Sequence, residues 1–85
     1  MSSYFINLMK DTLLSLNGCA VIVKVIKDDG TENQPSKGIL HPYSWPYDSC
    51  EFETLDDVCA DFKFRMDNVE NITVGKSGAV ILVRR

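Results

Sequence analysis

The chain lacks most of the features that mark catalytic, secreted or membrane-spanning proteins. It has one histidine, and none of its three cysteines forms a C-x-x-C pair. No apolar run approaches the about 18 residues of a spanning helix, and the first residues lack the basic segment of a secretory signal. Nine basic against twelve acidic residues give a net charge of −3, which is a poor basis for gripping a phosphate backbone. We therefore expect a cytoplasmic protein without membrane contact or direct nucleic-acid binding.

The amino-acid composition is that of an ordinary folded domain. The chain has 85 residues, of which 45% are hydrophobic and 25% charged. It is too short for two cores, so residues 1–85 are expected to form a single domain. The odd number of cysteines favours reduced, buried thiols. The alternative is a zinc site built from Cys19, Cys50, Cys59 and His41, but these positions lack the close pairs of most structural zinc sites, and we expect no metal or cofactor.

The apolar pattern predicts a helix near the N-terminus and a central strand after it. Apolar residues recur at helical spacing over residues 3–16, and Asn17-Gly18 is a typical helix stop. The stretch Cys19–Lys27 is apolar on both faces, which predicts a central strand. Asp28-Asp29-Gly30 is a turn signal, and the return strand is expected to pair only around Lys37–His41.

Residues 54–69 fit two patterns. Thr54 followed by Asp57 resembles a capping box, and the apolar residues after it repeat at helical spacing, namely Leu55, Val58, Cys59, Phe62, Met66 and Val69. Phe62, Phe64 and Met66 also alternate with charged residues, as they would in a strand. Since the helical matches are more numerous, we expect a helix over about 54–67.

The remaining elements complete the predicted fold. Residues 50–54 alternate as a short strand with one wet face. Residues 71–74 and 79–83 predict a hairpin that turns at Lys76–Gly78, and its second strand is expected beside the strand at 20–26. The order α-β-β-β-α-β-β predicts an α+β fold, a mainly antiparallel sheet of about five strands with two helices packed on it. The alternative is a small SH3- or Sm-like β-barrel with an N-terminal helix.

Two resemblances bear on function. The segment Phe64-Arg-Met-Asp-Asn-Val-Glu-Asn-Ile72 is similar to the closing strand of small Sm-like and WYL-type barrels, in which Phe-Arg-x-Asp precedes an aliphatic residue. This resemblance implies a ligand- or nucleic-acid-sensing barrel. In size and charge, the chain also resembles small host-takeover proteins of phages, including anti-CRISPR inhibitors. A small nucleic-acid- or ligand-binding regulator is thus the alternative function, with basic contacts from Lys37, Lys63, Arg65, Arg84 and Arg85.

Aromatic residues are concentrated in one segment. Three of the eight aromatic residues of the chain, Tyr43, Trp45 and Tyr47, lie within five positions. Pro42 and Pro46 exclude a helix and a central strand, so residues 41–47 are expected to form a loop or an extended edge. Tyr and Trp are enriched among interface hot spots, which suggests a binding surface. The alternative is that Trp45 folds inward and plugs the end of a small core.

Acidic residues follow this segment directly. Half of all the acids lie in fourteen residues that contain no Lys or Arg, namely Asp48, Glu51, Glu53, Asp56, Asp57 and Asp61. Together with the aromatic residues they predict a surface that binds a protein partner with a basic surface. The alternative is a solvated strand face followed by ordinary helix-start acids.

Catalysis has little support in the sequence. The only histidine, His41, precedes a proline, and no residue pattern indicates an activated nucleophile. We therefore expect a small acidic, non-enzymatic protein-binding module of phage-like type. It would inhibit or modulate a larger partner, one that could itself bind nucleic acid. The sequence does not indicate an oligomeric state.

Overall fold

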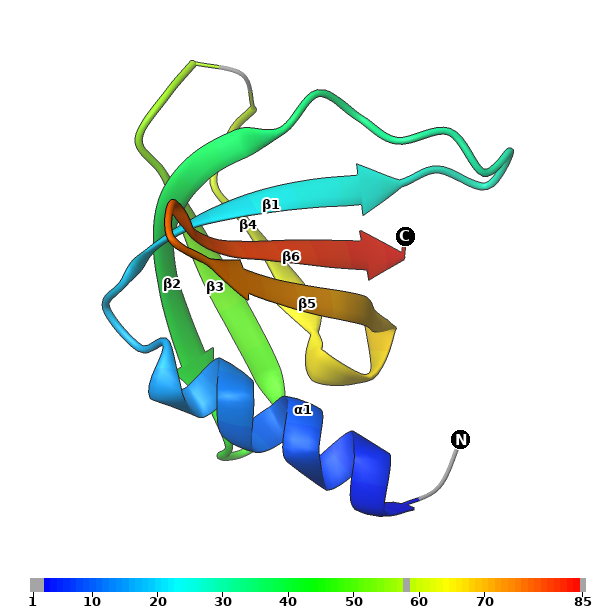
Figure 1. The fold of residues 1–85 in the computed structure, drawn as a ribbon, viewed down its shortest axis with the longest axis vertical. Coiled ribbons are helices and arrows are strands. Elements are labelled where there is room, and N and C mark those ends of the chain that lie inside the picture. The colour runs from blue at the N-terminus through cyan, green and yellow to red at the C-terminus, as the bar shows by residue number, and fades with distance from the viewer. Residues whose placement is uncertain (1–2, 58, 85) are drawn as a thin grey trace.

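The computed structural model describes residues 3–57 and 59–84 and has an α+β fold, with one helix and a six-stranded mixed sheet (Figure 1). The elements in chain order are α1 (Ser3–Ser15), β1 (Ala20–Ile26), β2 (Ser36–Tyr43), β3 (Ser49–Thr54), β4 (Phe62–Arg65), the 3-10 helix η1 (Met66–Asn68), β5 (Val69–Gly75) and β6 (Gly78–Arg84). The sheet has the order β4-β3-β2-β1-β6-β5. Neighbouring strands are antiparallel except β1 and β6, which are parallel.

The elements with strong local signals form as predicted. The helix ends at Ser15, and Gly18 just beyond it has a φ of 76°, the left-handed conformation that favours glycine. The strand β1 lies between β2 and β6, which confirms that it is central. The hairpin of β5 and β6 is also confirmed, with Gly78 at a φ of 113° after the turn.

The predicted helix over 54–67 is wrong. Residues 55–57 and 59–61 are irregular chain, 62–65 form β4, and Val58 lies outside the described residues. The alternation of Phe62 and Phe64 places them on one face of β4, where the ring of Phe62 packs against Phe52 of β3 with centroids 5.4 Å apart and against Phe64 with centroids 6.0 Å apart. This cross-strand packing outweighs the helical spacing. The order α-β-β-β-α-β-β, the second helix and the five-strand count are therefore wrong, whereas the α+β class is confirmed.

Residues 41–43 form the end of β2, extended and paired with β3 beyond the ladder with β1, which agrees with the expected extended edge, and residues 44–47 form a loop. Pro42 lies inside β2, where it pairs with Cys50 of β3. Leu40 N donates to Cys19 O on the β1 side, and the backbone N atom of residue 42 faces the same side because amide directions alternate along a strand. The β1 ladder ends at the pair of Ala20 and Ile39, so Pro42 lies beyond it. The missing N–H therefore removes no ladder bond.

The core lies on one face of the sheet and under α1. Leu13 of α1 is completely buried, and α1 packs against β2 and η1. The sheet contributes alternate residues from its strands, namely Val21, Val23, Leu40, Cys50, Phe52, Phe64, Ile81 and Val83. Among the described residues no ladder joins β4 to β5, so the sheet is open and the closed-barrel alternative does not describe it. The segment 64–72 that resembles a barrel strand instead spans the end of β4, η1 and the start of β5.

No helix within residues 3–57 and 59–84 is both long and apolar enough to span a membrane.

Candidate binding surface

The aromatic loop, residues 43–47, lies at the tip of the β2–β3 hairpin. The hairpin pairs Tyr43 with Ser49, and the bond between Trp45 and Pro46 is cis. The exposed fractions of the aromatic side chains are 45% for Tyr43, 83% for Trp45 and 73% for Tyr47. The alternative that Trp45 plugs the core is therefore wrong. Three large rings project into solvent from a single loop.

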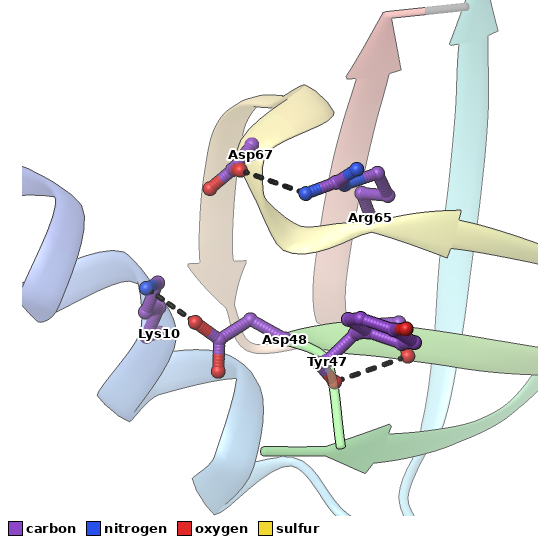
Figure 2. Close-up of polar contacts among 6 residues, drawn as sticks. Lys10, Tyr47, Asp48, Arg65 and Asp67 are labelled. Carbon is purple, nitrogen blue, oxygen red and sulfur yellow. Dashed lines mark hydrogen bonds and ion pairs between the residues drawn. The ribbon is translucent and has the colours of Figure 1, made fainter. Parts of the chain in front are cut away.

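The base of the aromatic loop is tied to two other elements. Lys10 Nζ of α1 lies 2.5 Å from Asp48 Oδ2, and this hydrogen bond raises the pKa of Lys10 (Figure 2). Met66 N donates to Asp48 O at 3.0 Å, which joins the loop to the start of η1. Ser49 Oγ donates to Tyr47 O at 3.4 Å. These contacts hold the loop while leaving its rings exposed.

The outer face of β2, β3 and β4 carries paired charges. His41 Nε2 lies 3.0 Å from Glu53 Oε1, and Lys63 Nζ lies 3.3 Å from Glu51 Oε1. A shallow hollow of about 330 Å³ lies among these four residues and Tyr43. Each glutamate thus has a hydrogen-bond or ionic partner within the chain, and exposed pairs of this kind contribute little to stability.

The acids after β3 lie away from the aromatic loop. Asp56 accepts hydrogen bonds from Ser36 Oγ at 2.9 Å and Lys37 N at 2.8 Å, and Asp61 accepts one from Thr54 N at 2.9 Å. Asp57 is exposed. The six residues of β3 separate this group from the loop by roughly 17 Å. The structure thus brings Asp48 together with the three aromatic residues, but not Asp56, Asp57 or Asp61.

The residues of the alternative basic surface are mostly paired as well. Besides the contact of Lys63 with Glu51, Arg65 lies 3.7 Å from Asp67, and Arg84 bonds Glu70. Lys37 is exposed, and Arg85 lies outside the described residues. Local neutralisation of three cations weakens this face as a phosphate-binding surface.

Sequence analysis missed the role of Lys10 and the contacts of the acids. Lys10 and Asp48 are 38 positions apart, so no local pattern relates them. A large cleft between β1, β6 and β4 was also missed, because the segment at 62–65 was predicted as helix. The alternation of Phe62 and Phe64 was the signal that could have revealed it.

The three cysteines do not form a cluster with His41. Cys19 is exposed, Cys50 is buried and Cys59 is half-buried, and all three are free thiols. Burial raises the pKa of Cys50 to about 12, so this thiol is not an activated nucleophile. Within residues 3–57 and 59–84, no group of three or more His, Cys, Asp or Glu side chains could hold a metal ion, so the four side chains of the zinc alternative do not form a site.

Comparisons of the chain with protein families, curated proteins and solved structures find no match. Its function is therefore inferred from its own residues.

Proposed function

We propose that the protein is a small non-enzymatic protein-binding module that inhibits or modulates a larger partner, as phage inhibitors do. The aromatic loop is the centre of its contact surface. The observation that carries this proposal is the 83% exposure of Trp45, next to Tyr47 at 73%. Large apolar rings gathered at one exposed site are typical of interaction surfaces, because their burial on a partner removes apolar area from water.

The support beneath the loop suits it to binding. Asp48, Lys10 and Met66 hold its base, and both flanking strands are part of the sheet. A preordered loop loses little conformational entropy when it binds, and the Tyr and Trp side chains have few rotatable bonds. The loop therefore offers contact area at a low ordering cost.

Charge has a secondary part in the proposal. The net charge of −3 favours a partner with a basic surface and would accelerate their encounter at low salt. Most acids of the segment 48–61 are bonded within the chain, whereas Asp57 is exposed. We expect the charges to steer association and the aromatic rings to hold the complex.

The experiment compares partner capture by matched variants. Wild-type protein, Trp45→Ala, Tyr47→Ala and Val74→Ala are each used as bait for proteins of the source cell. Val74 is 66% exposed on the edge strand β5, so its truncation controls for the loss of an exposed apolar side chain elsewhere. A true partner is retained by wild type and Val74→Ala, and Trp45→Ala binds it at least tenfold more weakly, a loss of about 1.4 kcal/mol.

Two further measurements separate the parts of this proposal. Asp57→Lys should slow association at low salt and leave dissociation unchanged. Steeply salt-dependent binding of DNA or RNA would instead favour the nucleic-acid alternative. Equal capture of the same partner by wild type and both aromatic variants would refute the aromatic loop as the contact centre.

A further inference from the structure

The two edge strands of the sheet differ in charge. Among the described residues, β4 and β5 are the first and last strands in the order, so each has one side without a ladder. The strand β4 carries Lys63 and Arg65, and charged side chains on an edge strand oppose its pairing with another strand. Residues 71–75 of β5, which follow its bulge, contain no charged side chain. This edge therefore lacks the charges that keep an edge strand unpaired.

The backbone groups on the free side of β5 belong to Ile72 and Val74. Gly75 and Gly78 lie directly opposite each other and close a two-residue turn, so they form a hydrogen-bonded pair. Hydrogen-bonded and non-hydrogen-bonded pairs alternate along an antiparallel ladder. Thr73 is therefore bonded to β6, whereas the N–H and C=O groups of Ile72 and Val74 point away from β6 towards the free side.

The side chains of this segment are accessible on both faces of the strand. Val74 is 66% exposed, and Thr73, which points to the opposite face, is exposed as well. Ile72 is half-buried and packs against the core, so it shares the core face of the sheet with Val74. The principal contacts of α1 are with β2 and η1, and β5 lies beyond β6 at the end of the sheet (Figure 1). A strand added beside β5 would meet aliphatic side chains on one face and a hydroxyl on the other.

A second, antiparallel copy of β5 matches this edge residue by residue. When Thr73 lies opposite Thr73 of the second copy, Ile72 of each copy lies opposite Val74 of the other. The outward groups of these two residues then form about four backbone hydrogen bonds across a twofold axis. The aliphatic side chains meet on one face and the threonine hydroxyls on the other, and both are favourable cross-strand pairs. A register centred on Ile72 would instead place the carboxylate of Glu70 opposite Val74, so the register centred on Thr73 is favoured.

We propose that the protein forms a homodimer in which two β5 strands pair antiparallel about a twofold axis at Thr73. The two six-stranded sheets become one continuous sheet, and both copies contribute the same residues to the interface. Because the paired segments are short, the association is weak, with a Kd between about 10 μM and 1 mM. None of the paired residues belongs to the aromatic loop, so the dimer does not depend on the proposed function, and Trp45→Ala should dimerise like wild type.

The test is sedimentation equilibrium of the full chain under reductant, which prevents the exposed Cys19 from cross-linking two copies. Over about 5 μM to 2 mM protein, the weight-average mass should rise from 9.6 kDa towards twice that value. Thr73→Lys should weaken the dimer about tenfold, because it places like charges directly opposite each other at the axis. Thr31→Lys is the matched control and should dimerise like wild type, since Thr31 is also an exposed threonine but lies in the turn between β1 and β2. Both substitutions are at exposed positions, so the circular dichroism spectrum should remain that of wild type.

Two further measurements test the axis and the paired strand. Thr73→Glu alone should weaken the dimer as Thr73→Lys does, whereas an equimolar mixture of the two variants should associate at least as tightly as wild type, because opposite charges then face each other. Hydrogen exchange of the Ile72 and Val74 amides should slow as the protein concentration rises, since these amides are bonded only in the dimer. The amide of Thr73 is bonded within the chain, and its exchange should be much less sensitive to concentration.

Several results would overturn this proposal. One is a mass of 9.6 kDa at every concentration, and another is equal weakening of the dimer by Thr73→Lys and Thr31→Lys. A mixture of the two charged Thr73 variants that stays monomeric would exclude a twofold axis at this residue. A dimer that Trp45→Ala abolishes, without any change in exchange at Ile72 and Val74, would indicate that the copies associate through the aromatic loop instead.

Discussion

Gly38 is the position where adding one methyl group should damage the fold most. An ideal Cβ on Gly38 would lie 2.3 Å from the backbone O of Glu53 and 2.6 and 2.8 Å from two ring carbons of Phe52. Favourable contacts between carbon atoms lie at about 3.5–4.0 Å, so the neighbouring strand or the ring would have to shift by about 1 Å. Gly38 pairs with Thr54, so β3 cannot move away without losing part of its ladder with β2.

We expect Gly38→Ala to lower the free energy of unfolding by about 2–3 kcal/mol. Overpacking a core costs about 1–3 kcal/mol, and this site lies at the upper end because one clash is with a backbone atom. The lower entropy of the unfolded alanine chain offsets about 0.4–1 kcal/mol of that cost. The result is a large share of the about 5–15 kcal/mol that stabilises a typical domain.

The assay is urea unfolding followed by circular dichroism. Fluorescence of the only tryptophan is unsuitable, because Trp45 is already 83% exposed in the folded protein. Gly75→Ala is the matched control, because a Cβ there meets nothing within 4 Å and its φ is not in the left-handed region. Gly75→Ala should leave the free energy of unfolding unchanged or slightly raised. If the two variants agree within about 0.5 kcal/mol, the close packing of β2 under Phe52 is refuted.

Three further predictions concern the helix, the loop and a buried thiol. Leu13→Ala, at a completely buried position of α1, should lower the free energy of unfolding by about 3–5 kcal/mol in the same assay. Trp45→Ala should change it by less than about 0.5 kcal/mol, and a larger loss would mean that the ring packs inward. The folded protein keeps the Cys50 thiol protonated up to a pKa of about 12, against 9.0 for the ordinary group. The contribution of Cys50 to stability, measured as the difference from Cys50→Ala, should therefore be complete below about pH 9 and decline as the pH rises towards 12. In the folded protein at pH 9, iodoacetamide should modify the exposed Cys19 long before Cys50, as peptide mass spectrometry would show.

The elements that the sequence alone determined are those whose causes lie within a few residues. Helical spacing and a glycine stop specify α1 and its end near Ser15. Two apolar strands around a short glycine turn specify the hairpin of β5 and β6. Apolar residues on both faces of β1 predicted its place inside the sheet. Contacts close in sequence decide these features, so a local pattern suffices.

The candidate binding surface could likewise be predicted from the sequence only in part. The proline-rich aromatic loop was visible in the sequence, because Tyr43, Trp45 and Tyr47 lie within five positions. Whether Trp45 points inward or outward was not visible, since that depends on how α1 and β4 close the core around the hairpin. The acids were predicted to form one surface because they lie within fourteen positions of the chain. Their partners come from α1, β2 and β4, and these contacts remove most of them from a shared surface.

Tertiary contacts determine the secondary structure of residues 54–67. Their helical periodicity is real, but the strand alternation allows Phe62 to pack against both Phe52 and Phe64, and β4 extends the sheet. A local pattern cannot weigh this pairing, because the competing contacts come from β3, a separate element of the chain. The same pairing creates the cleft between β1, β6 and β4, since β4 supplies part of its lining. For residues 54–67 the sequence allowed a helix or a strand, and the packing of aromatic rings between β3 and β4 decided that residues 62–65 form a strand.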